Sequence, residues 1–484
     1  MIFHVKNHYV HTKMVTLTPK VLKNSSIPDY YAGKSVFITG GTGFIGKVLI
    51  EKLLYSCPDI DKIYILIREK KGLTASERAQ QFRNDPENLN KKYQTNHQIF
   101  LFQLFERVKN KRPKDLEKIV VIPGDIMTPN LGLSAENENM LLDKVSTIIH
   151  AAATLKFNEG LSEVWKMNVE GTRKMLALSR KMKRLEVFVH ISTAYTNTDR
   201  EVVEEIIYPP PADINEVYQY IQEGITEEQT KKALNGRPNT YVFTKALAEH
   251  LVAENQAFVP TVIVRPSIVA AIKDAPIRGW VENWNGASAL CMFASSGMNR
   301  VIYGCRSYTI DLIPVDYVTN LIITAGARSS KYLRIYNCCS SACNPVTYGK
   351  LADSFLKDTI EHKSRYAFLS GWCTYTRHKW LVTLITTLFQ LIPAYLADFY
   401  RRLMGKNPRY LKLHYLVIQT REVLEFFTSH SWVMKADRVR ELFASLSPAD
   451  QHTFPCDPTD INWTEYLQDY YLGVQELQKR TSRK

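Results

Sequence analysis

Tyr241 and Lys245 lie four residues apart in "YVFTK", so a helix over this segment would place both side chains on one face. A phenol titrates at about pH 10 and exchanges protons poorly near neutrality unless its anion is stabilised. An ammonium group one helical turn away stabilises that anion and lowers the pKa of the phenol. The pair therefore indicates proton-transfer chemistry, although the same spacing is common on surface helices that carry no site.

Two further segments carry groups that would assist such chemistry. In "HISTAY" (190–195), at the end of a predicted strand, Ser192 or Thr193 can offer a hydroxyl group to a carbonyl oxygen. Asn168 in "MNVEGT" could support a water or the active-site backbone, and an ordinary helix-end amide explains it nearly as well. Together with the Tyr–Lys pair, these groups favour a reaction at a carbonyl group.

A glycine-rich loop follows the first apolar run of the chain. In "TGGTGFIG" (39–46), Gly40 permits a sharp turn, Gly43 lets the backbone approach a pyrophosphate, and Gly46 allows a helix to pack closely on a strand. The next helix aims its free N–H groups at the phosphates. Tight strand–helix turns also select glycine, but the position between a strand and "KVLIEKLL" favours a dinucleotide site that includes Thr42, Phe44 and Ile45.

The end of the second predicted strand indicates which dinucleotide binds. NAD sites usually carry Asp or Glu there, about 20 residues beyond the glycines, to bind the ribose 2′-hydroxyl. This chain has Arg68 in "ILIREKKG", followed by Lys70 and Lys71. Cations in place of a carboxylate suit a 2′-phosphate, so we predict NADP(H), although a basic loop can also be merely solvated.

The other predicted cofactor contacts lie where later strands end. Lys245 can hydrogen-bond the nicotinamide ribose in addition to its effect on Tyr241. Asp125 and Ile126 follow the third predicted strand, where they could meet the adenine. Ala151 and Ala152 would border the cofactor from the fourth strand, and the backbone at Pro266 and Ser267 could border the nicotinamide amide.

The elements that must position these residues alternate between apolar strands and helical patterns from residue 34 to about 330. Nearly continuous apolar runs separated by helices predict an α/β fold, a Rossmann-type doubly wound parallel sheet with a smaller, mainly helical C-terminal domain. We expect an N-terminal segment at 1–33, the cofactor-binding domain at 34–345 with an insertion at 198–240, and the C-terminal domain at 346–484. The predicted strands are 35–40, 62–68, 118–125, 147–153, 187–193 and 261–267.

Composition limits the class of protein. The 484 residues are 45% hydrophobic and 23% charged, which is typical of a globular chain, and the net charge of +14 favours anionic membranes or a polyanionic small molecule. No nucleic-acid-binding signature is present, so nucleic acid is not expected as a partner. The eight cysteines form no CxxC pair, which predicts reduced thiols in a cytosol-facing protein and no metal site. The first residues lack a secretory core, and Met1 or Met14 could be the start.

Longer segments carry a resemblance. The stretches "IPDYYAGKSVFITGGTGFIGKVLIEKLL", "IYILIREKKG", "NTYVFTKALAE", "IVRPSIV" and "DLIPVDYV" resemble animal fatty acyl-CoA reductases, of insect type, within the extended short-chain dehydrogenase/reductase superfamily. The segment "FPCDPTDINWTEYLQDYYLGVQELQK" (454–479) is similar to the male-sterility C-terminal domain of that family. The resemblance runs from about residue 27 to the end.

The resemblance implies a specific reaction and specific residues. Long-chain acyl-CoA and two NADPH would give a fatty alcohol and free CoA through an aldehyde intermediate. The cofactor glycines of the family fall on Gly40, Gly43 and Gly46, and its catalytic pair falls on Tyr241 and Lys245. Its active-site hydroxyl falls on Thr193 or Ser192, and we expect Thr193.

The segment "WLVTLITTLFQLIPAYLADF" (380–399) is a marginal membrane span, because Gln390, Pro393 and Asp398 interrupt it and cations flank both ends. A kinked span, an interfacial or re-entrant hairpin, and a buried helix of the second domain all fit. We expect membrane attachment, with the endoplasmic reticulum favoured over the peroxisome because "KRTSRK" is not an SKL signal.

Two rival interpretations remain for the same fold. One is a steroid- or sugar-directed dehydrogenase or epimerase of the superfamily, which would not need the C-terminal domain. The other is a non-catalytic NADP-binding sensor, which would have no need of Thr193, Tyr241 and Lys245. Nothing in the sequence indicates an oligomeric state.

Overall fold

The three-dimensional arrangement comes from a computed structural model of the chain. It describes residues 25–69, 72–78, 103–155, 157, 159–282, 284, 286–361 and 372–482. The predicted cofactor contact Lys71, its neighbour Lys70, and the alternative starts Met1 and Met14 lie outside the described residues.

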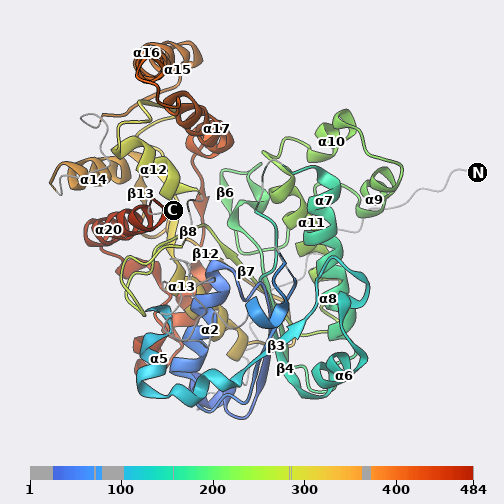
Figure 1. Ribbon diagram of the computed structural model, residues 1–484. Coiled ribbons are helices and arrows are strands. Elements are labelled where there is room, and N and C mark those ends of the chain that lie inside the picture. Colours follow the sequence, from blue (N-terminus) through green and yellow to red (C-terminus); the bar gives the residue numbers. More distant parts are fainter. Residues whose placement is uncertain are drawn as a thin grey trace, which may run out of the picture.

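A seven-stranded parallel sheet forms the centre of the molecule, in the order β12-β7-β5-β4-β1-β2-β3 (Figure 1). Reversal of strand order beside β1 is the doubly wound arrangement that places a ligand at the carboxyl ends of the strands. All six predicted strands are present. The strands are β1 (Ser35–Thr39), β2 (Ile63–Ile67), β3 (Ile119–Pro123), β4 (Val145–His150), β5 (Val187–Ile191), β7 (Thr261–Pro266) and β12 (Arg334–Cys338).

The edge strand β12 was not predicted. Its sequence "RIYNC" mixes polar and apolar residues, so it lacks the continuous apolar run by which the other strands were recognised. It pairs in parallel with β7, and α18 (Asp437–Ala444), from much later in the chain, packs against it. Its place in the sheet therefore depends on contacts distant in sequence.

Helices cover both faces of the sheet, which confirms the predicted fold class. In β1, Val36 and Ile38 join the core on one face, whereas Phe37 joins the core on the other. This alternation makes every residue of the strand apolar or buried. The first face carries α2 (Phe44–Ser56) and α13 (Val315–Ala327), and the second carries α6 (Ala135–Lys144), α8 (Gly171–Ser179) and α11 (Thr240–Glu254).

The segment predicted as an insertion forms its own small elements. A short strand, β6 (Val202–Val203), pairs in parallel with β15 (Val433–Met434) from the C-terminal part. Two helices follow, α9 (Ile214–Gln222) and α10 (Glu227–Leu234), and Thr226 begins the second with a capping box. The segment thus links the sheet to the last third of the chain.

The C-terminal part is mainly helical, as predicted, and the boundary near residue 345 stays a prediction. Its last helices return to the sheet, since Val439, Leu467 and Val474 join the core that contains Val36. The helices are α14 (Tyr348–Glu361), α15 (Lys379–Thr386), η6 (Thr387–Leu391), α16 (Ile392–Leu403), α17 (Tyr410–Thr428), α18, α19 (Pro448–Thr453) and α20 (Trp463–Ser482).

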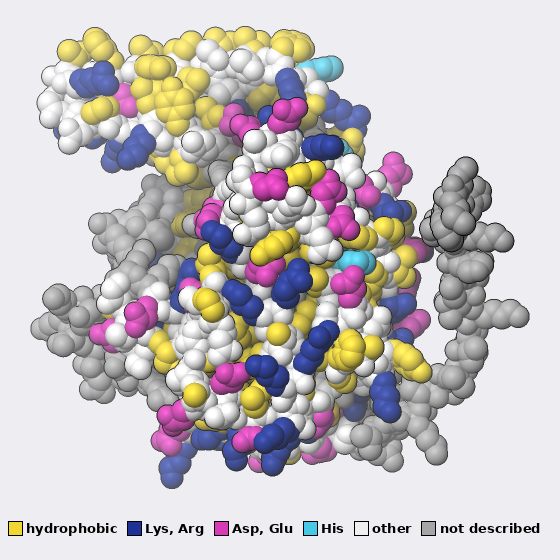
Figure 2. Space-filling model, turned by 90° about the vertical axis from the view of Figure 1, so that its right-hand side faces the viewer, with side chains coloured by type: hydrophobic (Ala, Val, Ile, Leu, Met, Phe, Trp, Pro, Cys, Tyr) yellow, Lys and Arg dark blue, Asp and Glu magenta, His cyan; other side chains and the backbone are white. Residues whose placement is uncertain are grey.

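Within this part, α15, η6 and α16 run on as one apolar helix, Lys379–Leu403, which covers the predicted segment 380–399. By length and composition it could cross a membrane, and it is the one such helix among the described residues. Figure 2 shows hydrophobic side chains along the outer edge of the uppermost layer, where this helix lies in Figure 1. The helix is weak evidence for membrane association.

Candidate active site

One cavity of about 930 Å³ lies at the carboxyl ends of the strands. It extends from the glycine loop past α11 to α17, so it draws on both ends of the chain. Every predicted site residue that the structure describes lines it. These are Gly40, Thr42, Gly43, Phe44, Ile45, Gly46, Arg68, Asp125, Ile126, Ala151, Ala152, Thr193, Tyr241, Lys245, Pro266 and Ser267.

The glycine loop has the geometry of a phosphate cradle. Gly40 has φ +75°, and a Cβ there would lie 2.7 Å from the backbone carbon of Ala151. A Cβ on Gly46 would lie 2.6 Å from the Cα of Gly41, so only glycine lets α2 begin this close to β1. Gly43 is the N-cap of α2 and offers no side chain to its first N–H groups. These first N–H groups of α2 can therefore donate hydrogen bonds to the pyrophosphate of a dinucleotide.

Two guanidinium groups border the cavity beyond this loop. Arg68 lies 3.7 Å from a carboxylate oxygen of Asp125 (Nη1 to Oδ2) and is half exposed. Arg78 donates to the Arg68 carbonyl oxygen and, at 3.4 Å, to Oγ1 of Thr42. Burial, with a smaller contribution from Arg68, lowers the pKa of Arg78. The residues present therefore fit a cofactor phosphate, which would neutralise the repulsion between the two cations.

The helix α11 places the predicted catalytic pair in the cavity. Asn239 begins α11 by accepting a hydrogen bond from the Val242 N–H at 2.9 Å. Tyr241 and Thr193 both line the cavity, and Lys245 donates to the Ile191 carbonyl oxygen at 2.6 Å. The three predicted catalytic groups therefore line the same cavity.

Burial shifts the pKa values of this pair in opposite directions. It raises the pKa of Tyr241 above its ordinary value, and the Thr193 hydrogen bond opposes the rise. Burial lowers the pKa of Lys245 to about 8, against the attraction of Glu249. Because the ammonium group is directed at a backbone carbonyl, the protein groups alone do not produce the low phenol pKa that the "YVFTK" spacing predicts.

Of the neighbouring hydroxyl and amide groups, Thr193 and Ser192 lie at the cavity, whereas Asn168 holds the surrounding chain in place. Thr193 accepts from the Tyr195 N–H and donates to the Pro266 carbonyl oxygen, both at 3.4 Å. Ser192 Oγ is buried in the cavity wall and has no hydrogen-bond partner among the described residues. Asn168 joins two backbone segments, because it donates to Thr244 Oγ1 at 3.0 Å and accepts from the Thr154 N–H at 3.1 Å. It therefore supports the active-site backbone, one of its expected roles.

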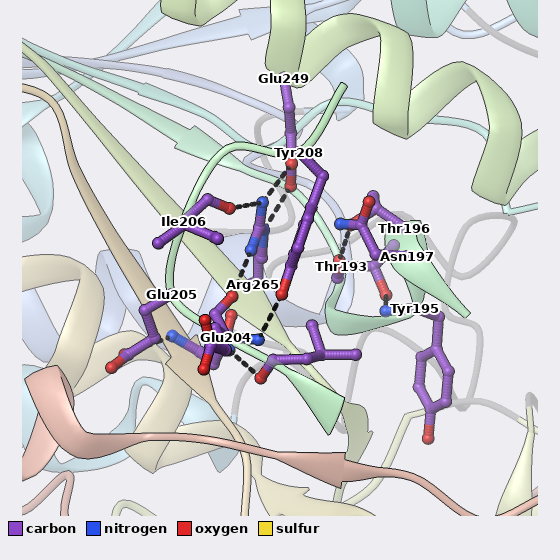
Figure 3. Close-up of polar contacts among 12 residues, drawn as sticks. Thr193, Tyr195, Thr196, Asn197, Glu204, Glu205, Ile206, Tyr208, Glu249 and Arg265 are labelled. Atoms are coloured by element: carbon purple, nitrogen blue, oxygen red, sulfur yellow. Dashed lines mark hydrogen bonds and ion pairs between the residues drawn. The ribbon is translucent and has the colours of Figure 1, made fainter. Parts of the chain in front are cut away.

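A buried ion pair fixes α11 to the sheet (Figure 3). Both carboxylate oxygens of Glu249 accept from Arg265 of β7, at 2.8 and 2.7 Å. Arg265 also donates to the carbonyl oxygens of Glu204 at 3.1 Å and Ile206 at 2.9 Å. Because Tyr241, Lys245 and Glu249 follow at four-residue steps, the pair holds the helix that carries the catalytic groups.

The far end of the cavity was not predicted and is lined mainly by apolar residues, together with Gln419, Thr420 and Thr428 of α17. One face of α17 forms its wall with Leu416, Val423, Leu424 and Phe427. Phe157 joins this wall to the catalytic end, since its ring centre lies 5.7 Å from that of Tyr241 and 6.2 Å from that of Phe427. The geometry thus combines a phosphate-binding end, a proton-transfer centre and an apolar extension.

Comparison with known proteins identifies the family. A model of an NAD-binding male sterility protein domain matches residues 38–322, more than half of the chain, and a second male sterility protein model matches 389–477. Fatty acyl-CoA reductase 1 of Homo sapiens is 36% identical over 458 residues, which cover 93% of this chain and 86% of that protein. Fatty acyl-CoA reductase 2 of Mus musculus is 36% identical over 459 residues, with the same coverage.

The chain belongs to the fatty acyl-CoA reductase family. Membership makes it an oxidoreductase with a nicotinamide cofactor. The predicted family is confirmed.

Solved structures confirm the fold of this reductase. The terminal R domain of the myxalamid PKS-NRPS pathway has a TM-score of 0.59 at 16% identity, covering 92% of this chain and 91% of that one. The reductase domain of a Mycobacterium tuberculosis nonribosomal peptide synthetase has a TM-score of 0.58 at 18% identity, with 92% of each chain covered. At these identities the likeness concerns the fold alone.

Sequence reasoning missed two groups of cavity residues in this reductase. Arg78 lies ten positions after Arg68, in a turn that Thr74 caps through its hydrogen bonds with Glu77. A capping pattern followed by a cation near the second strand is a signal that could have found it. The α17 wall gave no comparable signal, because only the fold brings it to the cavity.

Proposed function

We propose that the protein catalyses NADPH-dependent reduction of long-chain fatty acyl-CoA to fatty alcohol through an aldehyde, with release of CoA. One observation carries the proposal: a single cavity joins the paired arginines, the Thr193–Tyr241–Lys245 cluster and the apolar α17 wall. Arg68 and Arg78 suit a ribose 2′-phosphate, which NADPH has and NADH lacks. The apolar wall suits an alkyl chain.

The chemistry follows from where the protein donors lie. When bound, reduced nicotinamide supplies a hydride to the thioester carbonyl carbon. The hydroxyl groups of Thr193 and Tyr241, which line the same cavity, hydrogen-bond the carbonyl oxygen as it gains negative charge. Collapse of the resulting hemithioacetal breaks the C–S bond and expels CoA thiolate, leaving the aldehyde.

The second reduction needs a proton on the new alcohol oxygen. Tyr241 donates that proton, and Lys245, one turn away on α11, would hold the cofactor ribose. With the cofactor bound, Lys245 and the positive charge of the oxidised nicotinamide together would stabilise the phenolate, which the protein groups alone do not. The balance is one acyl-CoA, two NADPH and two protons giving one alcohol, one CoA and two NADP⁺. The apolar extension would retain the aldehyde between the two reductions.

We also propose that the protein is attached to a membrane, with its catalytic domain in the cytosol. The exposed apolar side chains of Lys379–Leu403 support attachment. Preference for the endoplasmic reticulum over the peroxisome stays an expectation from the sequence.

The decisive experiment supplies purified, detergent-stabilised protein with NADPH and acyl-CoAs of several chain lengths. We expect fatty alcohol, free CoA and two NADPH oxidised per alcohol. NADPH binding without alcohol from any chain length would overturn the proposal and favour a sensor. Reduction of a steroid or sugar ketone instead would favour the rival dehydrogenase.

Tyr241→Phe tests the assignment of the proton donor. The phenyl ring keeps the packing against Phe157 but cannot donate a proton, so we expect turnover to fall by roughly 10²-fold or more. NADPH affinity, measured by fluorescence titration, should stay within about twofold of wild type, since the ring is not a phosphate ligand. A variant that retains full activity would show that another group donates the proton.

A further inference from the structure

The helix Lys379–Leu403 has the opposite arrangement of polar and apolar side chains from a helix that packs on the core of a soluble protein. Its protein-facing side carries polar groups that are almost fully buried, Thr386, Gln390 and Asp398, at steps of four or eight residues. Its outer side is apolar and exposed. The exposed residues are Trp380, Leu384, Leu388, Phe389, Ile392, Tyr395, Leu396, Phe399, Tyr400 and Leu403.

The buried polar groups attach the helix to the rest of the protein. Gln390 donates to the Met298 carbonyl oxygen at 2.7 Å, and Thr386 accepts from Arg421 at 2.9 Å. Asp398 accepts from the N–H groups of residues 409–411 at 2.8, 3.0 and 2.9 Å, and so caps α17. A helix held along one side in this way would have to break these contacts to cross a bilayer.

Charge around the helix favours an anionic surface. Between residues 377 and 412 the chain has seven Lys or Arg residues and a single acidic residue, Asp398, which is buried. In Figure 2, Lys and Arg side chains lie around the apolar edge of this layer. Basic residues beside an exposed apolar face fit the headgroups and acyl region of an anionic lipid leaflet.

The same layer borders the open end of the cavity. Leu416 of α17 lines the cavity and is 50% exposed, and Gln419, one turn later, also lines it and is exposed. Tyr415, beside Leu416, is exposed like Tyr395 on the apolar side of α16, and α16 packs against α17. The cavity therefore reaches the surface next to the exposed apolar face.

We propose that the outer face of Lys379–Leu403 lies in one leaflet of an anionic bilayer, parallel to its surface, and that the acyl chain enters the cavity from the bilayer past Leu416. The entry route rests on the proposed acyl-CoA reduction, whereas the lipid contact does not. An alkyl chain on this route stays in mainly apolar surroundings from the leaflet to Tyr241, and the alcohol returns the same way.

Vesicle flotation tests the lipid contact without reference to activity. The full chain should float with phosphatidylcholine vesicles that contain phosphatidylserine, and less well with phosphatidylcholine alone or at high salt. Leu396→Glu/Phe399→Glu should weaken binding by about tenfold or more, because two apolar groups no longer enter the leaflet. The matched control Phe258→Glu/Tyr332→Glu changes two equally exposed apolar residues elsewhere and should bind as wild type.

Three results would overturn the proposed placement of this helix along one leaflet. One is flotation of the Leu396→Glu/Phe399→Glu variant as wild type. Another is absence of wild-type flotation together with a dimer that this variant abolishes, which would assign the face to a second copy of the chain. The third concerns orientation: in sealed microsomes, His378→Cys and Gly405→Cys should both react with an impermeant maleimide, and protection of one alone would show a spanning helix.

Leu416→Glu tests the entry route. It should leave flotation unchanged and lower reduction of vesicle-bound palmitoyl-CoA by about tenfold or more, since a charge now stands where the alkyl chain passes. Reduction of water-soluble octanoyl-CoA should fall by a smaller factor, because its short chain makes fewer contacts with this part of the wall. Equal effects on both substrates would overturn the route. Absence of wild-type turnover with either substrate would instead reject the proposed function while leaving the flotation result standing.

Discussion

At the scale of single residues, burial controls the ionisation of the catalytic cluster. Lys245 pays a desolvation cost as an ammonium ion, and Tyr241 would pay one as a phenolate. The charge on Lys245 is therefore kept at the expense of stability, which is a frequent property of functional sites.

Lys245→Met should abolish turnover without lowering the free energy of unfolding at pH 7. The folded-state pKa of about 8 lies below the ordinary 10.5, so the unfolded chain binds more protons between these values. The contribution of Lys245 to the free energy of unfolding is therefore lowest below pH 8 and rises as the pH increases from 8 toward 10.5. The Lys245→Met variant should lack this rise. Urea unfolding at pH 7 and pH 9 measures the difference. Destabilisation by more than about 1 kcal/mol at pH 7 would contradict the argument.

Arg68→Ala and Arg78→Ala should each raise KM for NADPH by roughly tenfold or more, since each removes a charged hydrogen-bond donor from the phosphate. KM for NADH, which lacks the 2′-phosphate, should change much less. Initial rates with both cofactors measure the ratio. Arg173→Ala, an exposed arginine outside the cavity lining, is the control. Equal increases in KM for NADPH and NADH would contradict binding of the 2′-phosphate by Arg68 and Arg78.

At the scale of elements, α11 connects catalysis with the sheet. It carries Tyr241 and Lys245 into the cavity and Glu249 onto Arg265 of β7. Arg265 in turn holds the backbone at residues 204–206, where the chain enters the segment 198–240. The orientation of the catalytic helix and the path of this segment therefore depend on the same ion pair.

Glu249→Gln should lower the free energy of unfolding by roughly 3 kcal/mol or more, because it leaves the buried Arg265 guanidinium without its counter-charge. Thermal or urea unfolding measures the loss. On the same helix, Glu254 forms an exposed pair with His250, and Glu254→Gln should change stability by less than about 0.5 kcal/mol. Similar effects of the two substitutions would show that Arg265 does not need the charge of Glu249.

At the scale of the whole molecule, the cavity exists only because distant parts of the chain meet. Residues near 40 supply the proposed cofactor end, residues near 193 and 241 the proposed reaction centre, and residues 416–428 the mainly apolar wall. The pairing of β6 with β15 helps to bring α17 to this position, since β15 follows α17 in the chain.

Val423→Trp should shift substrate preference toward shorter acyl chains. The larger side chain fills the part of the cavity between α17 and the reaction centre, so kcat/KM should fall by roughly tenfold or more for long chains and less for short ones. NADPH oxidation across a series of acyl-CoAs measures the shift. Leu472→Trp, on the exposed side of α20, is the control. An equal fall in kcat/KM at all chain lengths would show that α17 does not contact the acyl chain.

The sequence by itself determined the features that depend on neighbours along the chain. Continuous apolar runs predicted six of the seven strands, and local spacing predicted the glycine loop and the Tyr241–Lys245 pair, because strand and helix periodicity are local properties. It also placed Arg68 beside the cofactor end, since a strand end has a fixed place in a doubly wound sheet.

Only the tertiary structure decided the rest, and the physical reason is long-range packing. The strand β12 depends on pairing with β7, and Arg78 reaches the cavity only through a turn packed against Arg68. Asp398 looked like an interruption of an apolar segment, yet it is buried and caps a helix that begins a dozen residues later. That contact fixes which side of Lys379–Leu403 meets the protein, and therefore which side is left for the surroundings.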